Sequence, residues 1–301
     1  MRSLGMHHVK QGNNIRAMEC FEMALELNGL FEQIWFLLGC VAMQLEYWNK
    51  ALQAFFRTVA LDQDNADAWN NLAATHLQLK NPESALKALK EAGKRQYDNW
   101  KIWKNIFQVA LSLGELLEAI TAYRRVVEIM GAEAPLEDLQ IILGAFATAV
   151  STYGLADKFV IATSKQIGSL LDKVMANHFS LRYAFWNLCA EYTKIIGEND
   201  DTIEFYFKAY RAMQHLCPEN KLEDLQIILL CLENIHKNIE RARLNHPHNT
   251  LDLDDRCLQL SKISENLLRK ISVSQGNTIE IAELRKLAKN SSIISDGTVI
   301  E

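Results

Sequence analysis

The sequence predicts an all-α protein built from repeated pairs of helices. Residue types recur every 34 positions over the first 130 residues, in four separate series. Two of these series are tryptophan (Trp35, Trp69 and Trp103) and alanine (Ala17, Ala51, Ala85 and Ala119). The other two are an aliphatic series (Leu4, Leu38, Leu72 and Ile106) and a bulky series (Phe21, Phe55, Leu89 and Tyr123). Helical periodicity alone does not keep four series in phase, so each 34-residue stretch is one repeated structural unit.

The composition also favours helices. Hydrophobic residues make up 49% of the 301 residues and charged residues 23%, which indicates a chain that folds around a substantial apolar core. Only four prolines and 13 glycines are present, and so few helix breakers favour long helices over a fold rich in turns.

The residue types match the tetratricopeptide repeat, which reads Trp-x2-Leu-Gly-x2-Tyr and then Ala-x3-Phe-x2-Ala. Two antiparallel helices cross closely only where side chains are small, which explains Gly5, Gly39 and Ala73 as well as the alanine series. The Trp, Leu and Phe or Tyr positions fill the gaps between neighbouring helices. Phe107 stands where the pattern has a small residue, so we expect the fourth pair to be locally splayed.

The pattern predicts four repeats over residues 1–133, the first of them truncated, stacked as a right-handed superhelix (an α-solenoid). The expected helices are 1–11, 14–27, 31–44, 48–61, 65–79, 82–95, 99–112 and 116–130. Met1 stands where the first repeat would carry its tryptophan, so we expect the chain to be a fragment of a longer protein; the alternative is that self-association covers the exposed end of the array.

Residues 134–289 are expected to form a degenerate helical-repeat extension of about six helices. Four residues fit one further unit over 183–216: Trp186, Ala190, Tyr206 and Ala209. The octapeptide Leu-Glu-Asp-Leu-Gln-Ile-Ile-Leu occurs at 136–143 and again at 222–229, each time with the acidic first turn that favours a helix start. Residues 245–250 are predicted to be a loop and residues 290–301 a disordered tail.

Three segments of the repeat region resemble the carboxyl-terminal half of the tetratricopeptide repeat protein 27 family. They are RSLG at 2–5, DNADAWNNLA at 64–73 and QYDNWKIWKN at 96–105. The resemblance runs from Arg2 to about Val127 and more weakly to about Lys289. It implies a non-enzymatic helical repeat linked to the assembly of protein complexes, including spliceosomal ribonucleoprotein particles, without the amino-terminal half of that family.

The first helix of each pair lines the inner groove of such an array. On this basis we expect a partner-binding groove formed by Gln33, Phe36, Leu37, Cys40, Asn70, Asn71, Lys101, Lys104 and Asn105. Amides can bond a peptide backbone, lysines attract acidic side chains, and Phe36 with Leu37 can seat an apolar anchor. The alternative interpretation is a solvated face, or a groove filled by another part of a longer protein.

Some tetratricopeptide arrays hold the acidic tails of chaperones with a two-carboxylate clamp of lysine, asparagine and arginine. Only Asn71 and Lys101 match that clamp here, while Phe36 and Cys40 occupy two of its other positions. Chaperone carboxyl-terminal tails are therefore not the expected partners.

No motif predicts catalysis, a cofactor or a metal. His246 and His248 precede Asp252, Asp254 and Asp255 in the predicted loop, but no ligand spacing of a metal site accompanies them, so we expect a solvated loop. The sequence contains no glycine-rich phosphate loop and no Gly-x-Ser-x-Gly motif. We therefore expect a protein that is not an enzyme.

The expected partners are other proteins, bound by a scaffold or adaptor. The alternative is an RNA-binding helical repeat, which would need a basic groove. The net charge is −5 and the expected groove carries Asp67 beside two lysines, so nucleic acid is not favoured. The six cysteines form no Cys-x-x-Cys pair, and no apolar segment approaches the ~20 residues that span a bilayer. We expect the cytoplasm, the nucleus or both, and no membrane.

Overall fold

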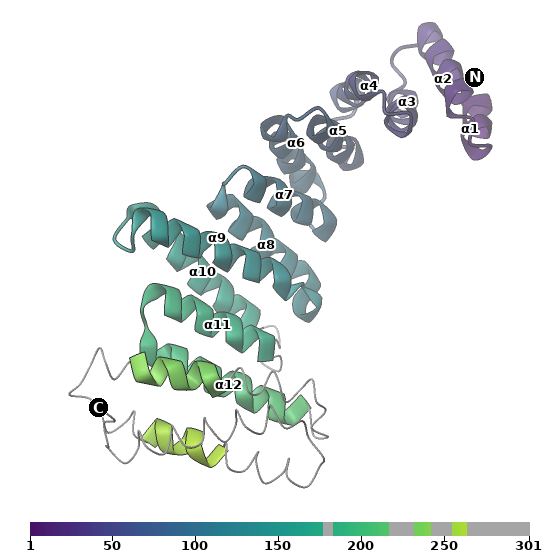
Figure 1. The fold of residues 1–301 in the computed structure, drawn as a ribbon. Helices are drawn as coiled ribbons and strands as arrows, with labels where there is room; N and C mark the ends of the chain where they lie inside the picture. Colours follow the sequence, from purple (N-terminus) through teal and green to yellow (C-terminus); the bar gives the residue numbers. More distant parts are fainter. Residues whose placement is uncertain (177–182, 217–231, 242–254, 264–301) are drawn as a thin grey trace. The chain divides into compact units, whose positions relative to one another are not determined.

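The computed structural model describes residues 1–176, 183–216, 232–241 and 255–263 (Figure 1). These residues form helices joined by turns and contain no β-strand, which confirms the all-α class. Contacts divide the chain into two compact units, Met1–Ala134 and Pro135–Glu301, and each is considered by itself below.

The first unit consists of eight α-helices and one short 3₁₀ turn, Gly131–Glu133. The helices are α1 (Arg2–Lys10), α2 (Asn14–Leu27), α3 (Glu32–Gln44), α4 (Trp48–Leu61), α5 (Ala66–Gln78), α6 (Pro82–Arg95), α7 (Trp100–Ser112) and α8 (Leu116–Met130). Every helix end predicted from the sequence lies within one residue of the observed end. Each helix packs on its successor, so the unit is a row of stacked helix pairs.

The crossings inside the pairs depend on small residues, as predicted. The four alanines of the 34-residue series are completely buried. A Cβ atom added at Gly39 would lie 2.7 Å from the ring of Phe55, and one added at Gly5 would lie 2.5 Å from the ring of Phe21. The aromatic ring of the second helix therefore occupies the space that a side chain on the first helix would need.

In the fourth pair, two large aromatic rings lie at the crossing where other pairs have a small residue. Phe107 and Tyr123 are both buried, and their ring centroids lie 5.9 Å apart with the planes tilted by 45°. The pair therefore accommodates the bulky residue. Local splaying of its helices stays a prediction.

A hydrogen bond from each tryptophan joins the first helix of a repeat to the loop before it. The indole Nε1 atoms of Trp35, Trp69 and Trp103 donate to the carbonyl oxygens of Gly29, Gln63 and Tyr97, over 2.8 to 2.9 Å. Each acceptor precedes its tryptophan by six residues. The tryptophan thus contributes its ring to the packing and donates to a loop carbonyl outside the helices.

The second unit contains α9 (Leu136–Tyr153), α10 (Lys158–Ala176), α11 (Tyr183–Ile196) and α12 (Asn199–Leu216), and residues 232–241 and 255–263 are also helical. Helix α9 begins with the acidic octapeptide, as predicted, and packs against α10 and α11. The four residues of the expected degenerate repeat, Trp186, Ala190, Tyr206 and Ala209, are buried where α11 packs on α12.

Several predictions concern residues outside the described part of the chain. These are the second octapeptide at 222–229, the loop at 245–250 with His246 and His248, and the tail at 290–301. Among the described helices, none is long and apolar enough to cross a membrane.

Candidate partner-binding groove

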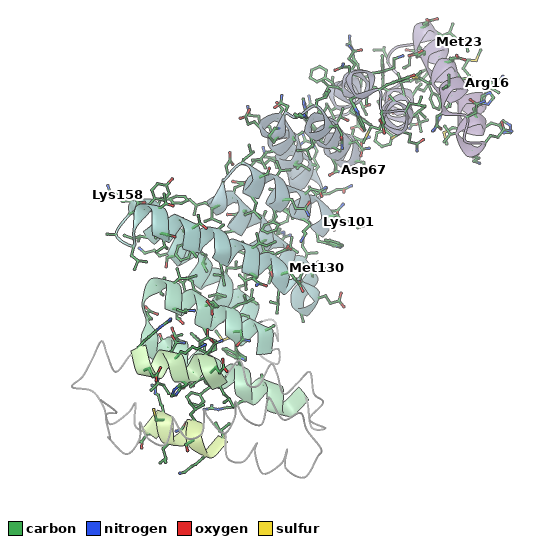
Figure 2. All side chains as sticks on the ribbon, in the orientation of Figure 1. Arg16, Met23, Asp67, Lys101, Met130 and Lys158 are labelled. Atoms are coloured by element: carbon green, nitrogen blue, oxygen red, sulfur yellow. The ribbon has the colours of Figure 1, made fainter. Side chains whose placement is uncertain are left out.

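The first helices of neighbouring repeats lie beside one another where the groove is predicted. Helix α3 contacts α5, and the Asn105 Nδ2 atom on α7 donates to Asn70 Oδ1 on α5 over 3.0 Å. Figure 2 shows Asp67 of α5 and Lys101 of α7 on the same side of the row. The structure therefore brings Asn70 and Asn105 together, and the other predicted groove residues lie on the same three helices.

The α3 section of this surface is mostly apolar. Phe36, Leu37, Cys40 and Met43 are half-buried, and the Phe36 ring packs edge-to-face on Phe55 at 5.9 Å. Burial, assisted by the negative charge of Asp67, raises the pKa of Cys40 to about 11. The thiol is therefore protonated at neutral pH and adds a small apolar surface. Gln33 is exposed at the start of the helix and supplies an amide.

The α5 section carries amides and one carboxylate. Asn70 and Asn71 are half-buried, and Asp67 is exposed one turn before Asn70. The hydrogen bond from Asn105 fixes the side chain of Asn70, so the polar floor of the groove is partly preorganised. Asparagine amides offer both a donor and an acceptor, which suits the backbone of a bound segment.

The α7 section carries two lysines that lie against aromatic rings. Lys101 Nζ is 6.0 Å from the ring centroid of Trp100, and Lys104 Nζ is 5.4 Å from that of Phe107. Lys101 is exposed and Lys104 is half-buried. Both lysines thus lay their stems against aromatic rings, and Lys101 lies on the same side of the row as Asp67 (Figure 2).

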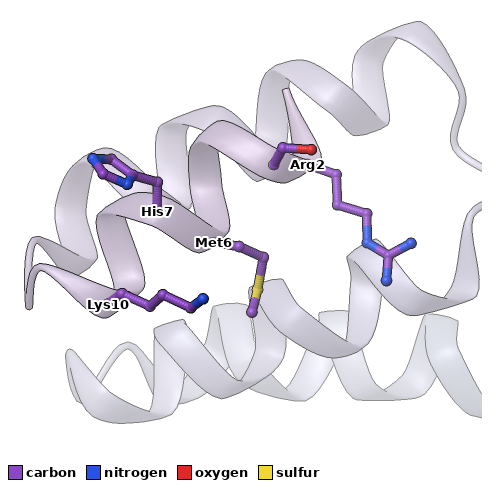
Figure 3. A pocket seen from close by; sticks show the side chains of 5 residues that line it. Arg2, Met6, His7 and Lys10 are labelled. Atoms are coloured by element: carbon purple, nitrogen blue, oxygen red, sulfur yellow. The ribbon is translucent and has the colours of Figure 1, made fainter.

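A hollow on α1 was not predicted from the sequence. Its volume is about 460 Å³, and its lining consists of Arg2, Ser3, Met6, His7 and Lys10 (Figure 3). Arg2, Met6 and Lys10 follow one another along one side of the helix. Arg2 precedes Phe36 by 34 residues, so the repeat spacing could have placed it on the groove face. Arg2 is therefore the α1 equivalent of a predicted groove residue.

The described residues hold no group of three or more histidine, cysteine, aspartate or glutamate side chains placed to bind a metal ion. The buried Cys189 has a pKa of about 12, raised chiefly by burial, so this thiol is also protonated at neutral pH.

Comparisons with known proteins agree with the repeat pattern. Residues 36–99 and 78–135 match the family model described as tetratricopeptide repeat. A tetratricopeptide-repeat-containing protein of Schizosaccharomyces pombe is 37% identical over 70 residues, which are 23% of this chain and 9% of that relative. The match thus spans about a tenth of the length of the relative.

Solved structures of repeat proteins are also similar at low identity. A crystal structure of MamA is 21% identical, covering 57% of this chain and 95% of MamA, with a TM-score of 0.44. YrrB, described as a TPR protein with an unusual peptide-binding site, is 19% identical, covering 59% of this chain and 84% of YrrB, with a TM-score of 0.41.

The family match and the observed helix pairs together identify the architecture. Residues 36–135 match tetratricopeptide repeats, and the described residues of the chain form a helical-repeat array. Stacked repeats of this kind present extended concave surfaces that bind other proteins.

Proposed function

We propose that this chain is a non-enzymatic scaffold that binds a partner polypeptide on the groove face of α1, α3, α5 and α7. One observation carries the proposal, namely the bond from Asn105 to Asn70 that links neighbouring repeats across the groove floor. This bond holds two of the proposed groove amides in place, and such preorganisation lowers the entropy that binding costs.

Each section supplies a different part of polypeptide recognition. Phe36 and Leu37 offer an apolar seat, Asn70 and Asn71 offer amides to the backbone, and the α7 lysines offer positive charge. A large aromatic side chain can act as the anchor of an interface, whereas the lysines would contribute charge complementarity.

The test is capture of cellular partners on the immobilised 301-residue chain, quantified by mass spectrometry. We expect Phe36→Ala to reduce the capture of specific partners by about fivefold or more, the effect of losing an interface anchor. The matched control is Phe56→Ala, because Phe56 lies on α4 and is 63% exposed. Equal capture by all three proteins, with unchanged circular dichroism, would place the binding site elsewhere.

The charge contribution is tested by the pair Lys101→Glu and Lys104→Glu. We expect lower capture and a weaker dependence on salt between about 50 and about 300 mM, because exposed charge attraction is screened. The control pair is Lys158→Glu with Lys165→Glu on α10, which changes the net charge equally at exposed positions in the other unit.

The alternative role is an RNA-binding repeat, and the same capture experiment tests it. The capture experiment is repeated with a labelled single-stranded RNA oligonucleotide as competitor. RNA that displaces the captured proteins, with a steep dependence on salt, would favour the alternative. We expect no displacement, because Asp67 interrupts the basic residues of the groove.

We further propose that the chain is the carboxyl-terminal repeat region of a tetratricopeptide repeat protein 27 family member, which acts in complex assembly in the cytoplasm or nucleus. The three segments at 2–5, 64–73 and 96–105 support this. Purification from cells under native conditions, followed by identification of stable co-purifying complexes, tests it. Recovery of no assembly factor or ribonucleoprotein component would oppose it. Chaperone tails are not expected among the partners.

A further inference from the structure

We infer that the groove takes a polypeptide segment with an apolar anchor flanked on both sides by acidic residues. The inference rests on the proposed function and adds the chemistry and spacing of the partner. Its basis is the separation of charge along the groove, where positive side chains lie on the two outer helices and an apolar section lies between them.

The outer helices carry cations and no acid. Helices α1 and α7 contain no aspartate or glutamate. On α1, Arg2 and Lys10 line the 460 Å³ hollow together with Met6 (Figure 3). On α7, Lys101 lies on the same side of the row as Asp67 (Figure 2), and Lys104 follows one turn later, next to Asn105, which bonds Asn70 of α5. Opposite charges on a partner would be attracted at both ends of the groove.

The inner helices lack positive charge. Helix α3 presents Phe36, Leu37, Cys40 and Met43, and α5 presents amides with Asp67. A continuous polyanion such as RNA would have its phosphates beside Asp67 and over the apolar α3 section, where nothing neutralises them. A segment whose charges are separated by apolar and neutral residues avoids that cost. Charge complementarity therefore favours a protein segment over nucleic acid.

The helix spacing sets the spacing of the partner's residues. Packed helices lie about 8–10 Å apart, and with this spacing at each step along the groove helices we expect the apolar section about 10 Å from α1 and about 20 Å from α7. An extended chain advances about 3.3 Å per residue. The predicted segment therefore has its anchor about three residues from one acidic cluster and about six residues from the other.

The direct test uses synthetic fluorescent peptides and the full 301-residue chain. The parent peptide carries acidic pairs about three residues before and about six residues after a Leu-Phe anchor, and its reversed sequence covers the opposite chain direction. Matched peptides replace the acids by serine and glutamine, or by lysine. Another moves the distant acidic pair next to the anchor. Fluorescence anisotropy measures affinity at about 50 and about 300 mM salt.

We expect the acidic peptide, in one of the two chain directions, to bind about tenfold more tightly than the neutral peptide. The lysine peptide should bind most weakly of the three. The advantage should shrink at high salt and when the distant acidic pair is moved. Equal affinity for the acidic, neutral and lysine peptides would overturn the inference, and so would the absence of binding by any of them. Displacement of the acidic peptide by an RNA oligonucleotide at equal concentration would also overturn it.

Two charge-reversed variants locate the binding. Arg2→Glu with Lys10→Glu, and Lys101→Glu with Lys104→Glu, should each weaken the acidic peptide by about fivefold and the neutral peptide by less than about twofold. Phe36→Ala should weaken both peptides. The α10 pair Lys158→Glu with Lys165→Glu is the control and should change neither affinity.

The results separate this inference from the proposed function. If Phe36→Ala lowers cellular capture but reversing the four basic residues does not, the groove remains the binding site and the acidic partner is rejected. Acidic peptides that bind equally to wild type and all groove variants would reject both.

Discussion

The repeat formed by α3 and α4 and the repeat formed by α5 and α6 share a core but differ at almost every position around it. Both bury an alanine at the crossing, Ala51 in one and Ala85 in the other, and both bond a tryptophan indole to the preceding loop. In the first repeat Gly39 faces Phe55, whereas in the second Ala73 occupies the position of Gly39 and Leu89 that of Phe55. The summed side-chain volume of Gly39 and Phe55 is similar to that of Ala73 and Leu89, as close packing requires.

The helix starts differ more sharply. Helices α5 and α6 begin after Asn65 and Asn81, whose side chains accept hydrogen bonds from the backbone of the first turn. Helices α3 and α4 begin after Phe31 and Tyr47, which make no such bond and are about half exposed. The α3–α4 repeat thus has weaker helix starts and more apolar surface, including the groove section around Phe36. Positions outside the shared core are free to serve binding instead of stability.

The largest expected effect tests the crossing of α3 and α4. A Cβ atom at residue 39 would overlap the Phe55 ring, so Gly39→Ala should destabilise the chain by about 1–3 kcal/mol. Ala73→Gly, the opposite change in the other repeat, should cost only the helix propensity of about 1 kcal/mol. Urea unfolding followed by circular dichroism measures both.

A second substitution sharpens this result. Phe55→Leu added to Gly39→Ala recreates the Ala73 and Leu89 pairing of the neighbouring repeat. We expect the double variant to be more stable than the sum of the two single effects by about 1 kcal/mol or more. Additive effects would show that the Phe55 ring does not set this crossing.

The next effect concerns the missing caps. Tyr47 has backbone angles close to those of Asn13, which caps α2 at the equivalent position, so Tyr47→Asn should form the cap without rearrangement. We expect a gain of about 1 kcal/mol, and Asn81→Tyr should lose a similar amount. Thermal unfolding of the two variants provides the measurement. If Asn81→Tyr lowers the stability but Tyr47→Asn does not raise it, then Tyr47 stabilises its turn in another way.

A smaller effect is expected where the two repeats agree. The turns inside the four pairs all have a residue with positive φ: Gly12 (75°), Glu46 (60°), Lys80 (57°) and Gly114 (75°). A side chain in this region costs about 1–2 kcal/mol, and the entropy of glycine offsets part of that. Glu46→Gly and Lys80→Gly should therefore each stabilise by about 0.5 kcal/mol, whereas Gly114→Ala should destabilise. Unequal gains at residues 46 and 80 would reveal a further contact in one turn.

The smallest effect is expected in the groove. Asn71 lies half-buried on the open face of α5, so Asn71→Ala should change the free energy of unfolding by no more than about 0.5 kcal/mol. Ala85→Leu, at a fully buried crossing, should cost about 1–3 kcal/mol. Similar shifts in the urea midpoint for these two variants would contradict the division between core and groove.

The sequence predicted the helices of the first unit to within one residue because their determinants are local and repeated. Crossing residues such as Gly39 and Ala51 carry a steric requirement that recurs at fixed spacing. The same spacing predicted which residues of α3, α5 and α7 line the groove. Their role in binding a partner stays a prediction. The α1 hollow was not predicted, although Arg2 stands 34 residues before Phe36, because a hollow depends on how side chains pack and not on repeat spacing alone.

The sequence by itself determined the fold class, the helix boundaries and the small residues at the crossings. Only the tertiary structure decided how neighbouring repeats meet. It brought Asn105 to Asn70, set the burial and the Asp67 charge that raise the pKa of Cys40, and left Phe31 and Tyr47 exposed where asparagine caps the next repeat. The reason is physical. A helix forms from contacts three or four residues apart, whereas a groove forms from side chains about 34 residues apart, whose distances depend on the angle at which one pair stacks on the next.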